Sequence, residues 1–148
     1  MNKRIITLKK YGAYARFHIE DLKELAVFAR ELLKQLKGGD VLALSGELGS
    51  GKTAFTKELA KAFCIQKIVT SPTFVLMNVY AFSKKYHGAL RLCHIDAYRL
   101  KSAKELEVLG AEEYIGDSAT ITVIEWPERV KGSFSKDALR MNFKIPKK

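Results

Sequence analysis

The sequence has few of the residues that staple or interrupt a chain. Its 148 residues include only two cysteines, three prolines and one tryptophan. Cys64 and Cys93 lie in apolar surroundings and are not spaced as a CxxC pair. We therefore expect two buried, reduced thiols and neither a disulfide framework nor a zinc site. A chain of this length can bury enough apolar surface to fold around one core without staples, so we expect one domain, residues 1–148.

Long hydrophobic runs are also absent. No apolar segment approaches the ~18 residues that suggest a membrane span, and residues 1–17 are too polar for the core of a secretory signal. No internal repeat or low-complexity segment is present. These absences predict a compact cytoplasmic protein without membrane contact.

Acidic residues are scarce relative to basic ones. The chain carries 26 Lys and Arg against 16 Asp and Glu, a net charge of +10. The balance is +9 in residues 1–100, −5 in residues 101–128 and +6 in residues 129–148, so one acidic block lies between basic ones. A basic balance raises the possibility of a nucleic-acid or acidic protein partner. A solvated basic surface is an equally good interpretation of the charge alone.

Apolar periodicity alternates between the patterns of strands and helices. Strands are expected at residues 4–8, 41–45, 74–80, 90–95, 120–125 and 139–145, and helices at residues 19–36, 52–63 and 105–114. The polar residues 83–88 are expected to close a hairpin, and the alternation in residues 139–145 is typical of a half-exposed edge strand. The order predicts an α/β fold with a mostly parallel central sheet and flanking helices.

One segment carries a specific chemical signal. Residues 46–53, GELGSGKT, fit the pattern G-x-x-x-x-G-K-[ST] between a predicted buried strand and a predicted helix. Glycines let the backbone bend so that amide groups point into one concavity, and the helix presents its positive N-terminal end to the same anion. Lys52 then neutralises phosphate oxygens, and the Thr53 hydroxyl can bind Mg²⁺. The pattern predicts a P-loop NTPase-like fold that holds the phosphates of ATP with Mg²⁺ through Gly46, Glu47, Leu48, Gly49, Ser50, Gly51, Lys52, Thr53 and Ala54.

A P-loop also needs an acidic residue on the Mg²⁺ side, normally at the end of a neighbouring strand. Asp96 and Glu125 each end an apolar strand, and from the residues alone either could fill this role. Thr73, in a Ser-Pro-Thr turn, is a candidate for sensing the γ-phosphate. Trp126 is more often a core or interface residue than a catalytic one. His94 is expected to be structural, on the face of its strand opposite to Asp96.

Five segments together resemble a known family. Residues 46–53, 70–74 (TSPTF), 94–100 (HIDAYRL), 105–110 (ELEVLG) and 124–128 (IEWPE) are similar, in order and spacing, to TsaE, the bacterial ATPase of tRNA threonylcarbamoyladenosine biosynthesis. The likeness extends over about residues 40–130. Ser50 stands where alanine is common in the family and Ala54 where threonine is common. Neither change removes a phosphate contact made by the backbone or by Lys52.

The resemblance implies a function and roles for particular residues. In that family, ATP binding and hydrolysis support a complex with TsaD and TsaB, which transfers a threonylcarbamoyl group to adenosine 37 of tRNAs reading ANN codons. It implies that Glu125 is the Mg²⁺-side carboxylate, that Thr53 is the hydroxyl ligand and that Asp96 serves hydrolysis or its water. Thr73 would lie in a switch-like loop, with Trp126 and Glu128 beside the nucleotide. Contact with tRNA is expected only indirectly, through the complex.

Two other functions compete with this interpretation. A small-molecule kinase on the same fold needs an arginine-bearing lid that excludes water, and the basic residues Lys84, Lys85, Arg91 and Arg99 give it only thin support. A basic nucleic-acid-binding module with a vestigial nucleotide site agrees with the charge of +10. It lacks a known RNA motif in which stacking aromatic residues alternate with basic ones.

Overall fold

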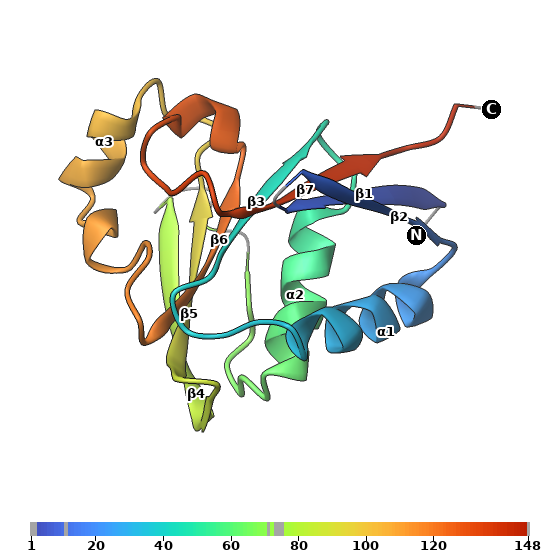
Figure 1. The fold of residues 1–148 in the computed structure, drawn as a ribbon, viewed down its shortest axis with the longest axis horizontal. Helices are drawn as coiled ribbons and strands as arrows, with labels where there is room; N and C mark the ends of the chain where they lie inside the picture. Colours follow the sequence, from blue (N-terminus) through green and yellow to red (C-terminus); the bar gives the residue numbers. More distant parts are fainter. Residues whose placement is uncertain (1–2, 11, 71, 73–75, 148) are drawn as a thin grey trace.

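The structure, a computed structural model, describes residues 3–10, 12–70, 72 and 76–147. These residues form one seven-stranded mixed sheet in the order β2-β1-β7-β3-β6-β5-β4 (Figure 1). The strands are β1 (Arg4–Lys10), β2 (Ala13–Ile19), β3 (Val41–Gly46), β4 (Met77–Tyr86), β5 (Ala89–Asp96), β6 (Thr120–Glu125) and β7 (Leu139–Lys144). The helices are α1 (Leu22–Leu33), α2 (Lys52–Ala62) and α3 (Ala103–Val108), with the 3₁₀ turns η1 (Ala111–Glu113) and η2 (Pro127–Val130).

The centre of the sheet is parallel and its margins are antiparallel. Strand β3 pairs in parallel with β6 and β7, and β5 pairs in parallel with β6. The pairs β1–β2, β1–β7 and β4–β5 are antiparallel. The predicted α/β class, with a mostly parallel centre and flanking helices, is confirmed. Because parallel strands point the same way, the carboxyl ends of β3, β5 and β6 meet at one edge of the sheet.

Two hydrophobic cores lie on opposite faces of this sheet. On one face, Leu42 and Leu44 of β3 pack with residues of α1 and α2, among them Leu25, Phe28 and Phe55. On the other face, a smaller core joins the central strands to α3 and η2, through Ile95, Ile124, Leu106 and Val130. The central strands are buried on both faces, which explains their nearly continuous apolar sequence. None of the helices formed by the described residues is long and apolar enough to cross a membrane.

Several sequence expectations need correction. Residues 13–19 form β2, which the prediction missed because six of its seven residues are exposed and leave no clear apolar alternation. Residues 139–145 were expected at an edge, yet β7 lies between β1 and β3. Its alternation arises because one face of β7 packs on the α1 and α2 side while the other remains exposed. The first residues of the strand expected at 74–80 lie outside the described residues, and β4 continues to Tyr86, so only His87 and Gly88 form the turn.

Other boundaries also differ. The helix expected at residues 105–114 is divided into α3 and η1, because Gly110 adopts a left-handed conformation between them. The two thiols are not alike. Cys93 is buried in β5, where burial raises the pKa of its thiol to about 12. Cys64 was expected to be buried and is instead exposed, just beyond the end of α2.

Candidate functional site

The loop between β3 and α2 has a shape that requires glycine. Gly46 has φ of +148°, and a Cβ atom on it would lie 2.5 Å from the carbonyl oxygen of Phe143 and 2.7 Å from Ser50 Oγ. Gly51, at the N-cap of α2, has φ of +107°, in the left-handed region that side chains disfavour. The two glycines therefore let the chain turn tightly against β7 and enter the helix.

The start of α2 differs from the start of α1. In α1 the Asp21 carboxylate accepts a hydrogen bond from the Glu24 amide at 2.9 Å, and the Glu24 carboxylate accepts one from the Glu20 amide at 2.6 Å. This arrangement is close to a capping box, except that Glu24 accepts from the residue before the N-cap, Asp21, and not from the N-cap itself. In α2 no side chain caps the helix and its first turn has no acidic residue. The first amide groups of a helix have no acceptor within it, so the start of α2 can receive an external anion.

Lys52 lies at the bottom of this loop and is almost fully buried, with 5% of its surface exposed. Its Nζ donates hydrogen bonds to the carbonyl oxygens of Gly46 at 2.5 Å and Glu47 at 3.0 Å. Nζ also lies 4.3 Å from the centroid of the Trp126 ring, in a cation–π contact. Burial lowers the pKa of Lys52 and outweighs the opposing effect of nearby carboxylates, of which Glu125 is the strongest. This buried cation is poised to contact an anion bound in the loop.

Thr53 and Glu125 connect the start of α2 to the end of β6. Thr53 Oγ1 donates to the two carboxylate oxygens of Glu125 at 3.1 and 3.3 Å. The same carboxylate is 2.5 Å from Nε2 of His94, which is completely buried. The sequence interpretation of His94 was wrong about its face: His94 and Asp96 are two residues apart on β5 and therefore point to the same side. The side chains of Thr53, Glu125 and His94 form a continuous polar row.

Asp96 ends β5 beside Glu125, its register partner across the parallel pair β5–β6. Asp96 is partly exposed, and its Oδ1 accepts a hydrogen bond from the Tyr98 amide at 3.0 Å. Two carboxylates and one hydroxyl are the hard oxygen donors that Mg²⁺ prefers. Within the described residues no group of three or more His, Cys, Asp or Glu side chains could hold a metal ion unaided. This donor set fits an ion that also keeps waters and binds substrate phosphates.

A cavity of about 280 Å³ opens over these groups. The ring of Trp126 forms part of its wall and lies 5.0 Å, centroid to centroid, from the ring of Tyr98. Trp126 has φ of +61°, a left-handed conformation that is uncommon for a large side chain. The cavity is lined by Leu48, Gly49, Ser50, Lys52, Thr53, Asp96, Tyr98, Arg99, Glu125 and Trp126.

Eight of the residues predicted for the site line this cavity, and Gly46, Glu47 and Gly51 belong to the adjoining loop, which leaves three exceptions. Thr73 lies outside the described residues, as do Ser71 and Phe74. Ala54 packs against the hydrophobic core, and its side chain does not line the cavity. Glu128 lines a neighbouring cavity, where its carboxylate accepts a hydrogen bond from Ser45 Oγ at 3.4 Å. Ser50 Oγ is buried and has no hydrogen-bond partner within the described residues, so the loop retains a spare polar atom.

Three residues contribute to the site although the sequence did not predict them as site residues. Arg4 of β1 donates from Nε to the Ser50 carbonyl at 2.9 Å and from Nη2 to the Gly49 carbonyl at 3.0 Å, which holds the loop from outside. No pattern links residues so far apart in the chain. Tyr98 and Arg99 lie just after Asp96, in a motif that the resemblance included without assigning them a role. They follow the strand-end carboxylate by two and three residues, and this closeness in the sequence could have identified them as site residues.

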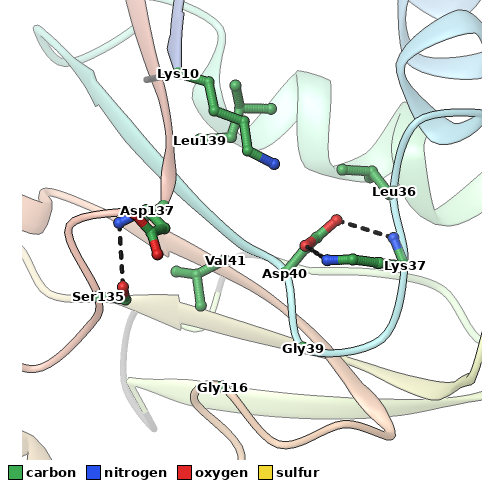
Figure 2. Close-up of a pocket in the computed structure, with 11 residues that line it drawn as sticks. Lys10, Leu36, Lys37, Gly39, Asp40, Val41, Gly116, Ser135, Asp137 and Leu139 are labelled. Carbon is green, nitrogen blue, oxygen red and sulfur yellow. Dashed lines mark hydrogen bonds and ion pairs between the residues drawn. The ribbon is translucent and has the colours of Figure 1, made fainter. Parts of the chain in front are cut away.

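A second cavity, of about 300 Å³, lies at the opposite edge of the sheet, near the amino ends of β3 and β7 (Figure 2). Its charged groups are largely satisfied within the chain. Asp40 accepts hydrogen bonds from the backbone amide of Lys37 at 2.9 Å and from its Nζ at 3.1 Å. Among the described residues, no helix begins at the residues that line this cavity.

Comparison with known proteins gives one consistent result. A family model described as threonylcarbamoyl adenosine biosynthesis protein TsaE matches residues 19–148. Proteins named tRNA threonylcarbamoyladenosine biosynthesis protein TsaE include similar chains from Rickettsia prowazekii, 36% identical over 83% of this chain and 81% of theirs, and Borreliella burgdorferi, 38% identical over 83% and 86%. The Treponema pallidum protein is 39% identical over 74% of this chain and 76% of its own. A crystal structure of Bacillus subtilis YdiB superposes with a TM-score of 0.68 at 27% identity, covering 100% of this chain and 81% of that one.

Proposed function

The chain belongs to the TsaE family, and on this premise we propose that it binds and hydrolyses ATP with Mg²⁺ in support of tRNA threonylcarbamoyladenosine biosynthesis. The observation that carries the proposal is the uncapped start of α2, with the buried cation of Lys52 beneath it and the Thr53–Glu125 contact at its side. The names of its relatives place those proteins in the same pathway. TsaD and TsaB are the partners that we propose.

Each site residue has a role that follows from its position. The amides of the loop and of the first turn of α2 hold the β-phosphate, as such helix starts do. Lys52 exchanges its two carbonyl contacts for oxygens of the β- and γ-phosphates. The hydroxyl of Thr53 and the carboxylate of Glu125 are the groups that would hold Mg²⁺. When bound, that ion supplies positive charge to the phosphate oxygens.

The charges of the site favour a nucleotide that carries a divalent ion. Lys52 lies in the field of the carboxylates of Glu125, Glu128, Asp96 and Glu47, so acidic groups outnumber this cation locally. Free ATP brings further negative charge and would be repelled by these carboxylates. A divalent ion between phosphates and carboxylates removes that repulsion. We therefore propose Mg²⁺–ATP as the species that binds.

Asp96 and Trp126 complete the arrangement. Asp96 is exposed enough to contact water and lies beside Glu125, a position suited to orienting the attacking water. The Trp126 ring covers Lys52 and excludes water from that cation, which strengthens its interaction with phosphate. Thr73, outside the described residues, stays a proposed sensor of the γ-phosphate.

Phosphate release from ATP in the presence of Mg²⁺ tests the proposal. We expect slow release without any added acceptor, stimulation by TsaD and TsaB together, and retention of the chain by TsaD and TsaB in an ATP-dependent pull-down. Transfer of phosphate only when a small-molecule acceptor is added would instead identify a kinase. Failure to bind Mg²⁺–ATP at all would overturn the proposal.

A further inference from the structure

The β2-β1-β7 part of the sheet has one face that is not covered. Helices α1 and α2 pack on one side of these strands, and no helix formed by the described residues lies over the other side (Figure 1). We call the uncovered side the open face. The strand registers place nine side chains on it: Ile5, Thr7, Lys9, Tyr14, Arg16, His18, Arg140, Asn142 and Lys144.

The charge of the open face has one sign. Lys9, Arg16, Arg140 and Lys144 are all exposed, and these three strands place no acidic side chain on it. None of the four cations forms an ion pair with a carboxylate within the described residues. Lys9 and Arg140 are direct register partners on β1 and β7. Like charges placed opposite one another destabilise a sheet, so the fold tolerates a cost here.

The surface continues beyond the strands into a hollow in which basic side chains outnumber acidic ones. A cavity of about 360 Å³ is lined by Arg140, Lys131 and Lys136, by the ring of Phe134 and by one carboxylate, that of Glu128. The Arg140 guanidinium lies 5.5 Å from the centre of the Phe134 ring. Across the open face, Lys9 Nζ lies 5.2 Å from the ring of Tyr14, which is 67% exposed. Aromatic rings therefore accompany the basic side chains at both margins of the surface.

We propose that the open face binds the phosphate backbone of RNA. Neighbouring strands lie about 4.8 Å apart and rise about 3.3 Å per residue, so the cations are spread over an area about 13 Å long. Thr7 and Asn142 offer hydrogen bonds between them. Such a mixture contacts phosphates and sugars, and exposed rings such as Tyr14 can stack on unpaired bases.

An acidic protein is a less suitable partner for this face. Protein interfaces depend on a central apolar or aromatic anchor that becomes desolvated. The centre of the open face holds Thr7, Arg16 and Asn142, and its aliphatic side chain, Ile5, is already half-buried. Most residues of β1 and β2 precede residue 19, where the family match begins, whereas β7 lies within that match. The inference depends on the proposed function only for the choice of tRNA as the RNA.

Binding of a fluorescently labelled tRNA transcript, followed by anisotropy at several salt concentrations, tests this inference. The triple variant Lys9→Gln, Arg16→Gln and Lys144→Gln removes one cation from each strand of the open face. The matched variant Lys23→Gln, Lys57→Gln and Lys67→Gln removes the same net charge from exposed positions on and after the helices. We expect the open-face variant to bind at least about tenfold more weakly, with a salt slope reduced by about 2, since each phosphate contact contributes about 0.7–0.9. The matched variant should stay within about twofold of the wild type.

Three results would overturn the inference: no binding of tRNA by the wild type at low salt, equal losses in the two triple variants, or competition by poly-L-glutamate as effective as that by unlabelled tRNA. The last would favour an acidic protein partner.

If the triple variant does not fold, the single variant Arg16→Gln tests the inference, with an expected reduction of the salt slope by about 0.7–0.9. Binding of a fluorescent ATP analogue is measured on the same samples. If the wild type binds the ATP analogue but not tRNA, this inference alone is rejected. If the wild type does not bind the ATP analogue, the proposed function is rejected.

Discussion

The two ends of the parallel pair β5–β6 carry charge in opposite ways. At the amino end, Arg91 is the register partner of Thr120, and its guanidinium donates to Thr120 Oγ1 and to the carboxylate of Asp117, each at 2.9 Å. At the carboxyl end, Asp96 is the register partner of Glu125, so two carboxylates lie side by side. The first arrangement joins opposite charges, and the second places like charges together.

This difference separates the part of the sheet that stabilises the fold from the part suited to chemistry. At the amino end, Asp117 Oδ2 also accepts from the Thr120 hydroxyl at 2.8 Å and from the Ala119 amide at 3.2 Å, so this oxygen has three donors within the chain. At the carboxyl end, Lys52 is buried among carboxylates yet bonds to backbone carbonyls. A ligand that binds both the cation and the carboxylates would stabilise this arrangement further, and a trade of stability for function is common at such sites.

The largest effect is expected from Lys52→Ala at the carboxyl end. The substitution removes the buried cation beneath the loop, so we expect ATP turnover to fall by about a thousandfold and phosphate binding to weaken. Lys57→Ala on the same helix is the matched control, because Lys57 is exposed and lies away from the cavity. Steady-state phosphate release and binding of a fluorescent ATP analogue measure both. Equal turnover in Lys52→Ala and Lys57→Ala would show that the carboxyl end of the parallel strands is not the site of ATP hydrolysis.

Replacing one carboxylate of the like-charged pair sharpens the comparison. Glu125→Gln should lower Mg²⁺-dependent turnover by about 100-fold, because the amide is a poorer partner for the ion and its ligands. Asp96→Asn should also lower turnover, while keeping the acceptor for the Tyr98 amide. Both variants relieve like-charge repulsion, so the Tm of the nucleotide-free chain should stay equal or rise.

Measuring turnover and Tm on the same samples separates these roles. If Asp96→Asn lost all turnover while Glu125→Gln retained it, the assigned roles of the two carboxylates would be exchanged. A clear fall of Tm in both variants would show that the pair stabilises the fold, and the contrast between the two ends of the sheet would disappear.

His94 gives a smaller and more selective test. Its buried Nε2 contacts the Glu125 carboxylate, so we expect it to orient that group. His94→Leu should raise the Mg²⁺ concentration for half-maximal turnover by about tenfold, with a smaller change at saturating Mg²⁺. His94→Gln keeps a donor of similar reach and should restore most of the affinity. Identical Mg²⁺ curves for His94→Leu and His94→Gln would mean that His94 only fills space.

The sequence predicted the parts of this site that are local in the chain. Residues 46–53 carry their strand, loop and helix start in one segment, so glycine positions and flanking apolar runs were sufficient. Asp96 and Glu125 could be placed at one edge because parallel strands end together. The alternation of residues 139–145 correctly indicated a strand with one exposed face.

What the sequence could not predict depends on contacts between distant segments. The Arg4 contacts with Ser50 and Gly49 join residues more than 40 positions apart. The position of β7 between β1 and β3 depends on the order of the strands. Side-chain alternation does not determine this order, because a strand with one buried face has the same sequence pattern at an edge and inside the sheet. His94 was predicted to lie on the opposite side of its strand from Asp96. Side chains two residues apart in a strand point to the same side, so this prediction could have been avoided.

Asp117→Asn tests the amino end, where we expect an effect on stability alone. A hydrogen bond from Thr120 is the main cause that lowers the pKa of Asp117 below its usual value of 3.8, with help from Arg91 and against the effect of desolvation. A carboxyl group whose pKa is lower in the folded than in the unfolded state stabilises the fold above the unfolded value, and loses that contribution as the pH falls through the folded value. The Tm difference between wild type and Asp117→Asn should therefore be constant near neutral pH and shrink below about pH 4.

Asp137→Asn, at an exposed carboxylate without an ion pair among the described residues, is the control and should show no such change. If Asp117→Asn instead reduced ATP turnover at unchanged Tm, charge at the amino end would serve the chemistry as well, and the two ends of the sheet would not be divided between stability and function.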